Sequence, residues 1–320
     1  MNLALIGYGN VGKAFARLLQ KKHAQYPFRI VAIHTARHGT AIEESGLPLE
    51  PQFGPAATNI EEFLDRSGAE VVFEITALNP STGEPAISHI RAAFARGMHV
   101  VTANKGPIAH AYSALREEAM RSGVQFRFES IVMDGTPIFN MVRETLPGLN
   151  VLGFTGVLNS TTNVVLEAME QGHSLEDGIQ LAQKIGVAEA DPGFDIDGWD
   201  ASAKTAALAN VLMGANTNPL AVDTKGIRKL TPEKLAELKA KGKTVRLVSR
   251  VHRGKHGLKM RVRAEVLELT DVLATARGTS SLLQLETDLM GTLGILEMNP
   301  GVEQTAYGLF SDLIDIAKTI

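Results

Sequence analysis

Short apolar runs and amphipathic stretches alternate along the first part of the chain. The apolar runs predict buried strands at 2–6, 29–34, 71–75 and 99–102. Stretches with apolar residues at helical spacing predict helices at 11–22, 60–67, 84–96 and 109–122. Strands that alternate with helices in this way are typical of an α/β fold with a doubly wound parallel sheet of the Rossmann type.

The pattern changes after residue 125, where longer alternating strands appear. We expect strands at 126–131, 151–158, 244–253, 258–269 and 279–288, with Gly254-Lys255-His256-Gly257 as the turn of an antiparallel hairpin. An amphipathic helix covers 305–320. This pattern predicts an α+β second domain, so we place a nucleotide-binding domain at 1–130 and a dimerisation and catalytic domain at 131–304. We expect helix 305–320 to pack back on the first domain.

Charged residues concentrate in the segment Gly186–Lys204, which reads GVAEADPGFDIDGWDASAK. Proline and glycine interrupt its first half. The second half predicts a helix that Asp197 caps and that ends near Gly214. Asp200 and Lys204 then lie four residues apart on one face of that helix.

Three interpretations of this acidic segment compete. An Asp/Lys pair at this spacing is commonly a surface ion pair. A calcium loop of the EF-hand type fails, because Lys204 would stand where the bidentate glutamate is required. The third interpretation is a pocket for a substrate ammonium group beside a lysine that transfers a proton. A polar run at 159–163 opens another helix, and its hydroxyl and amide groups suit either a carboxylate ligand or ordinary helix capping.

A glycine-rich turn follows the first strand. Gly7-Tyr8-Gly9-Asn10-Val11-Gly12 is GxGxxG between a predicted strand and a predicted helix, which is the context that a dinucleotide site requires. The first glycine allows the tight turn, the second lets the backbone approach a pyrophosphate, and the third packs helix on strand. We therefore predict that a nicotinamide cofactor binds at Gly7, Gly9, Asn10, Val11 and Gly12.

The ends of later strands supply the rest of the predicted cofactor site. Ligands of doubly wound sheets bind at the carboxyl ends of strands, so we expect contacts from five residues there: Thr76, Asn79, Thr102, Asn104 and Lys105. The second strand ends without an acid for the ribose 2′-hydroxyl, and Arg37 follows it. This favours NADP over NAD, although NAD remains compatible. The alternatives are that Arg37 and Lys105 are ordinary surface cations.

Composition narrows the function further. The chain has 320 residues, a net charge of −3 and no cysteine, which excludes disulfides, a thiolate nucleophile and cysteine-bound metals. Its balanced charge gives no reason to expect nucleic acid or membrane binding. No apolar run reaches the about 18 residues that span a bilayer, and no signal peptide is evident. We expect a cytoplasmic protein.

Seven segments, in order, resemble homoserine dehydrogenases over essentially the whole chain. They are GYGNVG, TALNPSTGEPA, HVVTANKGPIA, ESIVMDGTP, GVLNSTTN, AQKIGVAEADPGFDIDGWDASAKTAALAN and QTAYGLFSDL. The resemblance implies reversible NAD(P)-dependent interconversion of L-homoserine and L-aspartate 4-semialdehyde, in the biosynthesis of threonine and methionine. It also implies a homo-oligomer, a dimer or a tetramer. We expect a short form without the ACT domain or aspartate kinase module of some relatives.

The resemblance also assigns roles to individual residues. It makes Lys105 and Lys204 the catalytic lysines and places the substrate at Glu189, Asp195 and Asp200. It implies a monovalent cation, Na⁺ or K⁺, held mostly through backbone carbonyls at Glu129, Val132, Asp134 and Thr136. We add Asn159 and Thr161 as candidates for the substrate carboxylate. Two segments depart from the family pattern: Asp134, and the Asn299-Pro300-Gly301 turn.

The chemistry supports these assignments. Oxidation of an alcohol needs a hydride acceptor and a base for the hydroxyl proton, and without a thiol or zinc ligand set a lysine is the best base. Two lysines close together would each lower the pKa of the other. An aspartate-semialdehyde dehydrogenase would need the cysteine that this chain lacks. The alternatives from other classes are a non-catalytic NADP-responsive regulator and another Rossmann-type amino-acid dehydrogenase.

Overall fold

The apolar runs of the first part of the chain form one six-stranded sheet. The structure is a computed structural model that describes residues 1–255 and 257–319. The sheet has the order β3-β2-β1-β4-β5-β6. Its strands are β1 (Asn2–Ile6), β2 (Arg29–Thr35), β3 (Gly39–Ile42), β4 (Val71–Glu74), β5 (His99–Thr102) and β6 (Phe126–Arg127). Neighbours run parallel except β2 and β3, so the predicted doubly wound parallel sheet is confirmed.

Two strands of this sheet differ from the prediction. β3 was not predicted, because a four-residue strand next to glycine gives little periodic signal. The strand predicted at 126–131 ends at Arg127, and Glu129–Ile131 form a 3₁₀ helix, η1. There the N–H of Glu129 donates to the Asp312 carboxylate at 2.7 Å instead of extending the sheet.

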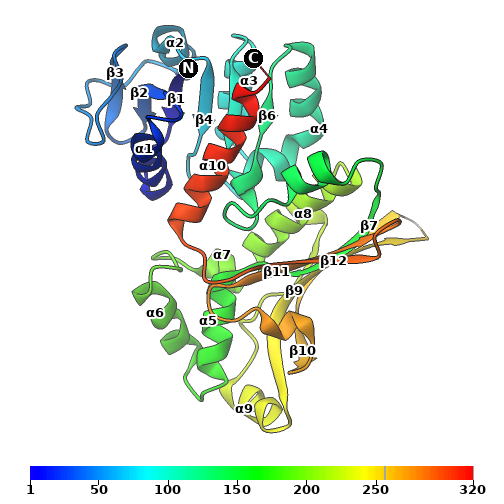
Figure 1. The fold of residues 1–320 in the computed structure, drawn as a ribbon. Coiled ribbons are helices and arrows are strands. Elements are labelled where there is room, and N and C mark those ends of the chain that lie inside the picture. The colour runs from blue at the N-terminus through cyan, green and yellow to red at the C-terminus, as the bar shows by residue number, and fades with distance from the viewer. Residues whose placement is uncertain (256, 320) are drawn as a thin grey trace. The chain divides into compact units, whose positions relative to one another are not determined.

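Five helices belong to this unit of the chain in its described part. They are α1 (Asn10–Lys22), α2 (Ile60–Ser67), α3 (Ala86–Phe94), α4 (Lys105–Arg121) and α10 (Val302–Ala317). Contacts divide the chain into a first unit, Met1–Asn140 with Gly301–Ile320, and a second unit, Met141–Pro300. Thus α10 belongs with the sheet that forms at the start of the chain, as Figure 1 shows in red.

The core of the first unit joins α1, the sheet and α10. Phe15 of α1 lies against Phe73 of β4, with ring centroids 4.5 Å apart. Leu309 and Leu313 of α10 are fully buried in the same cluster. The backbones also approach closely, because a Cβ at Gly135 would lie 2.1 Å from the Gln304 carbonyl oxygen. Only glycine permits this approach, so α10 is an integral part of the first unit.

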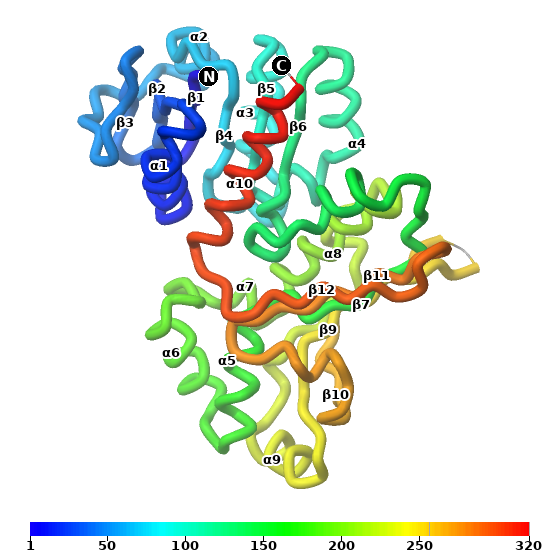
Figure 2. Tube along the Cα trace, in the orientation of Figure 1, coloured from blue at the N-terminus to red at the C-terminus, as the bar shows by residue number. Residues whose placement is uncertain are grey.

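The second unit is built on a mixed sheet with the order β12-β11-β7-β9-β10-β8. Its strands are β7 (Val151–Val157), β8 (Asp223–Thr224), β9 (Lys243–Gly254), β10 (Gly257–Glu268), β11 (Ser281–Thr287) and β12 (Thr292–Glu297). Neighbours are antiparallel except β10 and β8. Figure 2 traces β7 and β11 side by side although they are far apart in the chain.

The hairpin of β9 and β10 is confirmed by continuous pairing from Gly254↔Gly257 to Lys243↔Glu268. His256, in the predicted turn, lies outside the described residues, and so does Ile320 at the end of the predicted last helix.

The second unit also contains helices. They are α5 (Ser160–Met169), α6 (Leu175–Lys184), α7 (Gly193–Ile196), α8 (Trp199–Met213) and α9 (Pro232–Ala240), with 3₁₀ helices η3 (Pro219–Ala221) and η4 (Val272–Thr275) and a π-helical turn, η2 (Met141–Thr145). We had not predicted α6, although Ser174 and Asp177 form a capping box at its start.

The helix predicted in the acidic segment exists, but its first residue differs. α8 begins after Gly198, which is in the left-handed region at φ 86° and forms no side-chain cap. The prediction that Asp197 caps this helix is wrong, because its carboxylate binds Arg228 through two hydrogen bonds of 2.8 and 2.9 Å. The predicted end at Gly214 is confirmed by its left-handed conformation. Among the described residues, no helix is both long and apolar enough to span a bilayer.

Candidate active site

The glycine-rich turn of the first unit lies at the carboxyl end of β1. Gly7 has φ 101°, and a Cβ there would come within 2.6 Å of the Ile75 carbonyl oxygen at the end of β4. Gly12 packs against Ile75, since its added Cβ would meet that side chain at 3.1 Å. Gly9 differs, because an added Cβ would meet nothing within 4 Å. The backbone at Gly9 is therefore open to a ligand.

Helix α1 starts at this open position. Gly9 is its N-cap and offers no side-chain hydrogen bond. The N–H groups of the first helical turn belong to Asn10, Val11 and Gly12, and the bond from Lys13 N–H to the Gly9 carbonyl oxygen closes that turn. Free N–H groups and the positive end of the helix dipole favour an anion. The geometry at α1 fits the pyrophosphate of a dinucleotide.

The loops that follow β4 and β5 lie next to this turn, because β4 pairs with both β1 and β5. Asn104 caps α4 by accepting from the Gly106 N–H at 3.0 Å, and its side-chain amide donates to the Thr76 carbonyl oxygen at 3.3 Å. Thr102 accepts from the Asn104 N–H at 2.9 Å. Asn79 is engaged in its own turn, where it accepts from Ser81 and Thr82. Most of the predicted polar side chains here therefore shape the loops.

Lys105 and Arg37 occupy different positions around the same sheet. Lys105 is the first residue of α4 and is half-buried. Arg37 is exposed in the tight turn between β2 and β3. That turn, Thr35–Gly39, contains no acid. This turn thus carries an arginine, and no acid of its own, where ribose recognition takes place in dinucleotide folds.

The second unit contains a cluster of two carboxylates, a lysine and an asparagine. We call Asn159, Asp195, Asp200 and Lys204 the acid–lysine cluster. The amide nitrogen of Asn159 donates to Asp195 at 2.6 Å and to Asp200 at 2.9 Å. Lys204 Nζ lies 3.1 Å from Asp200 Oδ2 and donates to the Leu158 carbonyl oxygen at 2.7 Å. The predicted pairing of Asp200 with Lys204 is present, and it is not a surface ion pair, since their side chains are only 12% and 16% exposed.

Local structure explains how these residues converge. Asn159 is the N-cap of α5, where its side-chain oxygen accepts from the Thr162 N–H at 2.8 Å. This leaves its amide nitrogen directed at the two carboxylates. Asp200 lies in the first turn of α8, and Asp195 lies in the short helix α7 that precedes it. Two helix starts and one short turn therefore position the cluster.

The cluster carries excess negative charge. Burial, and then the neighbouring Asp200 carboxylate, raise the pKa of Asp195. Lys204 offsets one carboxylate, so a second cation would relieve the remaining repulsion. An ammonium group is such a cation. The arrangement suits an amino-acid substrate.

Two residues from the prediction lie apart from this cluster or at its edge. Glu189 is exposed, and in the described residues no hydrogen bond or ion pair joins its carboxylate to the acid–lysine cluster. Thr161 is buried, donates to the Val187 carbonyl oxygen at 3.0 Å, and lowers the pKa of Asp195 through a hydrogen bond. Thr161 therefore bonds to the backbone of the acidic segment, at Val187, and to Asp195.

The predicted cation site lies in the first unit. The buried Glu129 carboxylate accepts the N–H groups of Ile138, Phe139 and Asn140 at 2.6 to 2.8 Å. Asp134 adopts φ 49° and accepts from the Thr305 hydroxyl. Since these side chains are engaged, a monovalent cation would be held through backbone carbonyls there. Among the described residues, no group of three or more His, Cys, Asp or Glu side chains is placed to hold a metal.

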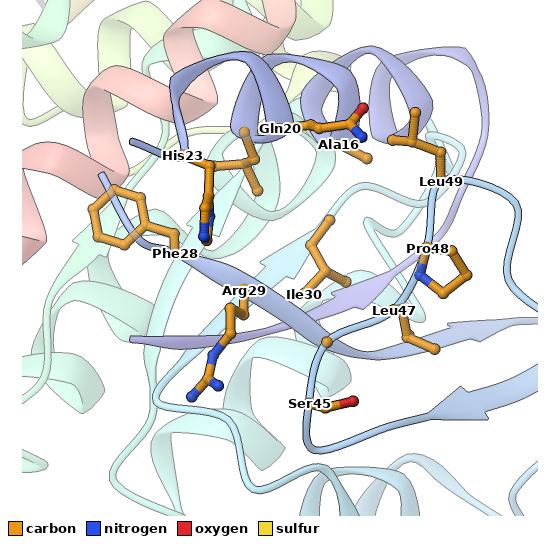
Figure 3. A pocket seen from close by; sticks show the side chains of 12 residues that line it. Ala16, Gln20, His23, Phe28, Arg29, Ile30, Ser45, Leu47, Pro48 and Leu49 are labelled. Atoms are coloured by element: carbon orange, nitrogen blue, oxygen red, sulfur yellow. The ribbon is translucent and has the colours of Figure 1, made fainter. Parts of the chain in front are cut away.

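A separate hollow of about 420 Å³ lies elsewhere in the first unit. Figure 3 shows side chains from α1, from the start of β2 and from the loop 45–49 around it. It lies toward the amino end of β2 and includes none of the predicted cofactor residues. None of its lining side chains has a buried polar atom without a hydrogen-bond partner in the described structure. We assign it no ligand.

The Rossmann sheet, the open helix N-terminus and the acid–lysine cluster together define a nicotinamide-dependent dehydrogenase for a substrate that carries an amino group. Family models agree with this class. The model described as homoserine dehydrogenase, NAD binding domain, matches residues 7–129, and the one described as homoserine dehydrogenase matches residues 137–314.

Individual relatives agree as well. The homoserine dehydrogenase of Methanocaldococcus jannaschii is 36% identical over 99% of this chain and 98% of its own. The NAD⁺-dependent homoserine dehydrogenase of Pseudomonas canavaninivorans is 32% identical over 99% of this chain and 96% of its own. A hyperthermophilic archaeal homoserine dehydrogenase in complex with NADPH has a TM-score of 0.83 and 26% identity, covering 100% of this chain and 98% of its own.

The chain belongs to the homoserine dehydrogenase family. It is therefore an NAD(P)-dependent oxidoreductase that interconverts L-homoserine and L-aspartate 4-semialdehyde. The resemblance seen in the sequence is confirmed, and the alternative of a non-catalytic regulator is not supported.

Proposed function

We propose that the acid–lysine cluster binds the amino group of homoserine. The single observation that carries this proposal is that Asn159 bridges the buried Asp200 carboxylate, which is paired with Lys204, and the half-buried Asp195 carboxylate, whose pKa is raised by burial and by Asp200. The substrate ammonium would neutralise the carboxylate that remains. Glu189 would contribute only from its exposed loop, and the backbone around Asn159 and Thr161 would face the substrate carboxylate.

The test is the dependence of the initial rate on homoserine concentration, followed by the absorbance of the reduced nicotinamide. Asp195→Asn should raise the KM for homoserine by about tenfold or more, the effect of losing one charged hydrogen bond. Asp197→Asn is the matched control, because Asp197 lies two residues away in the same segment but binds Arg228. Equal KM values for the parent and Asp195→Asn would contradict this assignment.

Lys105 and Lys204 have different roles in the proton transfer that we propose. A nicotinamide cofactor held at the N-terminus of α1 would supply the hydride acceptor for oxidation of the alcohol. The hydroxyl proton must go to a base, and the two lysines are the candidates. Lys204 is held as an ammonium by the Asp200 carboxylate and the Leu158 carbonyl. We therefore assign proton transfer to Lys105 and a fixed positive charge to Lys204.

The two units have different roles in this proposal. The first unit binds the dinucleotide through α1, and the second unit carries the substrate cluster and the subunit contact. Large apolar side chains remain exposed on the sheet of the second unit, including Leu152 of β7, Val266 of β10 and Leu296 of β12. Their burial would favour a homodimer or a dimer of dimers. Light scattering that gave a 34.3 kDa particle would contradict this.

For the cofactor, the proposal is a preference for NADP over NAD. Arg37 is exposed in the β2–β3 turn, and the turn Thr35–Gly39 contains no acid, so a 2′-phosphate at this turn would meet a cation. One relative is named as NAD⁺-dependent and another binds NADPH, so the family accommodates both cofactors.

We also propose a monovalent cation at the backbone of Glu129, Val132, Asp134 and Thr136. Replacing K⁺ and Na⁺ by a bulky organic cation should then lower thermal stability.

A further inference from the structure

Glu74 is a buried acid at the centre of the strand ends that carry the proposed cofactor site. It is the last residue of β4 and has no exposed surface. In register it lies between Ile6 of β1 and Thr102 of β5. A carboxylate in this position costs several kcal/mol unless hydrogen bonds or a cation compensate it. Its partners therefore show what it does.

Those partners are the residues that shape the two loops. The Glu74 carboxylate accepts from the Thr76 hydroxyl and, at 3.3 Å, from the Thr76 N–H. Thr102 donates its hydroxyl to the Glu74 carbonyl oxygen at 2.8 Å, and its oxygen accepts from the Asn104 N–H at 2.9 Å. The side-chain amide of Asn104 donates to the Thr76 carbonyl oxygen, and Asn104 also caps α4. A closed ring of hydrogen bonds thus runs through Glu74, Thr76, Asn104 and Thr102.

A histidine faces the same carboxylate from helix α3. The Nδ1 atom of His89 lies 3.5 Å from Glu74 Oε1. That nitrogen is buried and has no hydrogen-bond partner within the described chain, so its contact with Glu74 is electrostatic. His89 therefore lies against the Glu74 carboxylate from α3, while Thr76 contacts the same carboxylate from the loop that follows β4.

We propose that Glu74 is a positioning residue that fixes the β4 and β5 loops and, through Asn104, the first turn of α4 with Lys105. This rests on the proposed role of Lys105 and of the loops in cofactor binding. Glu74 touches neither substrate nor cofactor in this proposal. Loss of the carboxylate should let Thr76 and Asn104 move. This movement would displace Lys105 and the β4 and β5 loops that border the proposed cofactor site.

Glu74→Gln is the variant that tests this, because it keeps the shape of the side chain but replaces an acceptor by a donor. We expect the Kd for NADPH, measured by fluorescence, to rise about tenfold, which is the effect of losing one hydrogen bond between the loops that border the cofactor site. We expect kcat to fall on the order of 10²-fold, as for a reacting group displaced by about 1 Å. The KM for homoserine should stay within about twofold, because the acid–lysine cluster is untouched.

Glu70→Gln is the matched control, since Glu70 directly precedes the opposite end of β4 and accepts from the Asn2 N–H at 2.7 Å. It should leave the NADPH Kd and kcat at the parent values. Thr76→Val should give the same pattern as Glu74→Gln, and the double variant should be no worse than either, because both break one ring.

Three results would overturn the proposal. They are a folded Glu74→Gln protein with the parent Kd and kcat, equal losses in Glu70→Gln, and additive losses in the double variant. The Kd readout separates this test from the assignment of Lys105. A raised Kd with an unchanged kcat refutes the link to Lys105, and an inactive parent protein refutes the proposed function alone.

Discussion

The buried carboxylate of Glu129 should make the first unit less stable as the pH rises. Burial, and then the Asp312 carboxylate, raise its pKa from 4.5 to about 7, although three backbone N–H groups act in the opposite direction. A carboxyl group with a raised pKa binds its proton more tightly in the folded state than in the unfolded state. Stability is therefore lost as pH rises from 4.5 through about 7, and the whole loss is about 3 kcal/mol.

Glu129→Gln isolates this contribution, because the amide cannot ionise. Burial lowers the pKa of His34 and His99, so these histidines make stability rise with pH in the same range. Their effect is common to both proteins and cancels in the difference. From about pH 5 to about pH 8, the variant should gain about 3 kcal/mol relative to the parent. Urea unfolding followed by circular dichroism measures this, with a bulky organic cation as the salt.

A second variant tests the cause of the raised pKa. Asp312→Asn removes the neighbouring charge and keeps an acceptor for the Asn140 amide. Its own stability should therefore fall less with pH than that of the parent. A difference between the parent and Glu129→Gln that stays constant across the range, or that changes in the opposite direction, would refute the reasoning about burial.

Three other predictions follow from the site and the core. Lys105→Ala should lower kcat by roughly 10²–10⁴-fold, and Lys204→Ala should also lower kcat and shift the pH–rate profile; near-normal kcat in both would rule out the lysine mechanism. Arg37→Ala should lower kcat/KM for NADP⁺ more than for NAD⁺, and an equal effect would remove the basis for NADP preference. Gly308→Ala should destabilise the first unit by about 1–3 kcal/mol, because the added Cβ would lie 2.7 Å from the Gly135 Cα; an unchanged melting temperature would contradict this.

The elements that sequence could predict are those whose causes are local. The GxGxxG turn and the apolar strands depend on residues within a few positions of each other, so β1, α1, β2, β4 and β5 follow from the pattern. The ion pair of Asp200 and Lys204 also follows from helical spacing. Its burial does not, because that depends on Asn159 and Asp195, which reach it through the fold.

The features that sequence could not predict depend on distant partners. The strand expected through Ile131 ends early because Glu129 binds Asp312, 183 residues away. In the sequence Asp197 resembles a helix cap. In the structure its carboxylate instead accepts a hydrogen bond from Arg228, 31 residues away. Glu74 was overlooked as part of an apolar strand, VVFEI. A single acid inside a buried strand was the available signal, because such a group must have a partner.

Helix α10 has a consequence for how the protein is made. Its buried side chains complete the core of the first unit, yet all of the second unit, Met141–Pro300, precedes it in the chain. A ribosome that adds 5–20 residues each second would need roughly ten to thirty seconds to synthesise that intervening part. During this interval the nascent first unit exposes the apolar surface of α1 and the sheet that α10 later covers. We expect this nascent intermediate to be a substrate for chaperones.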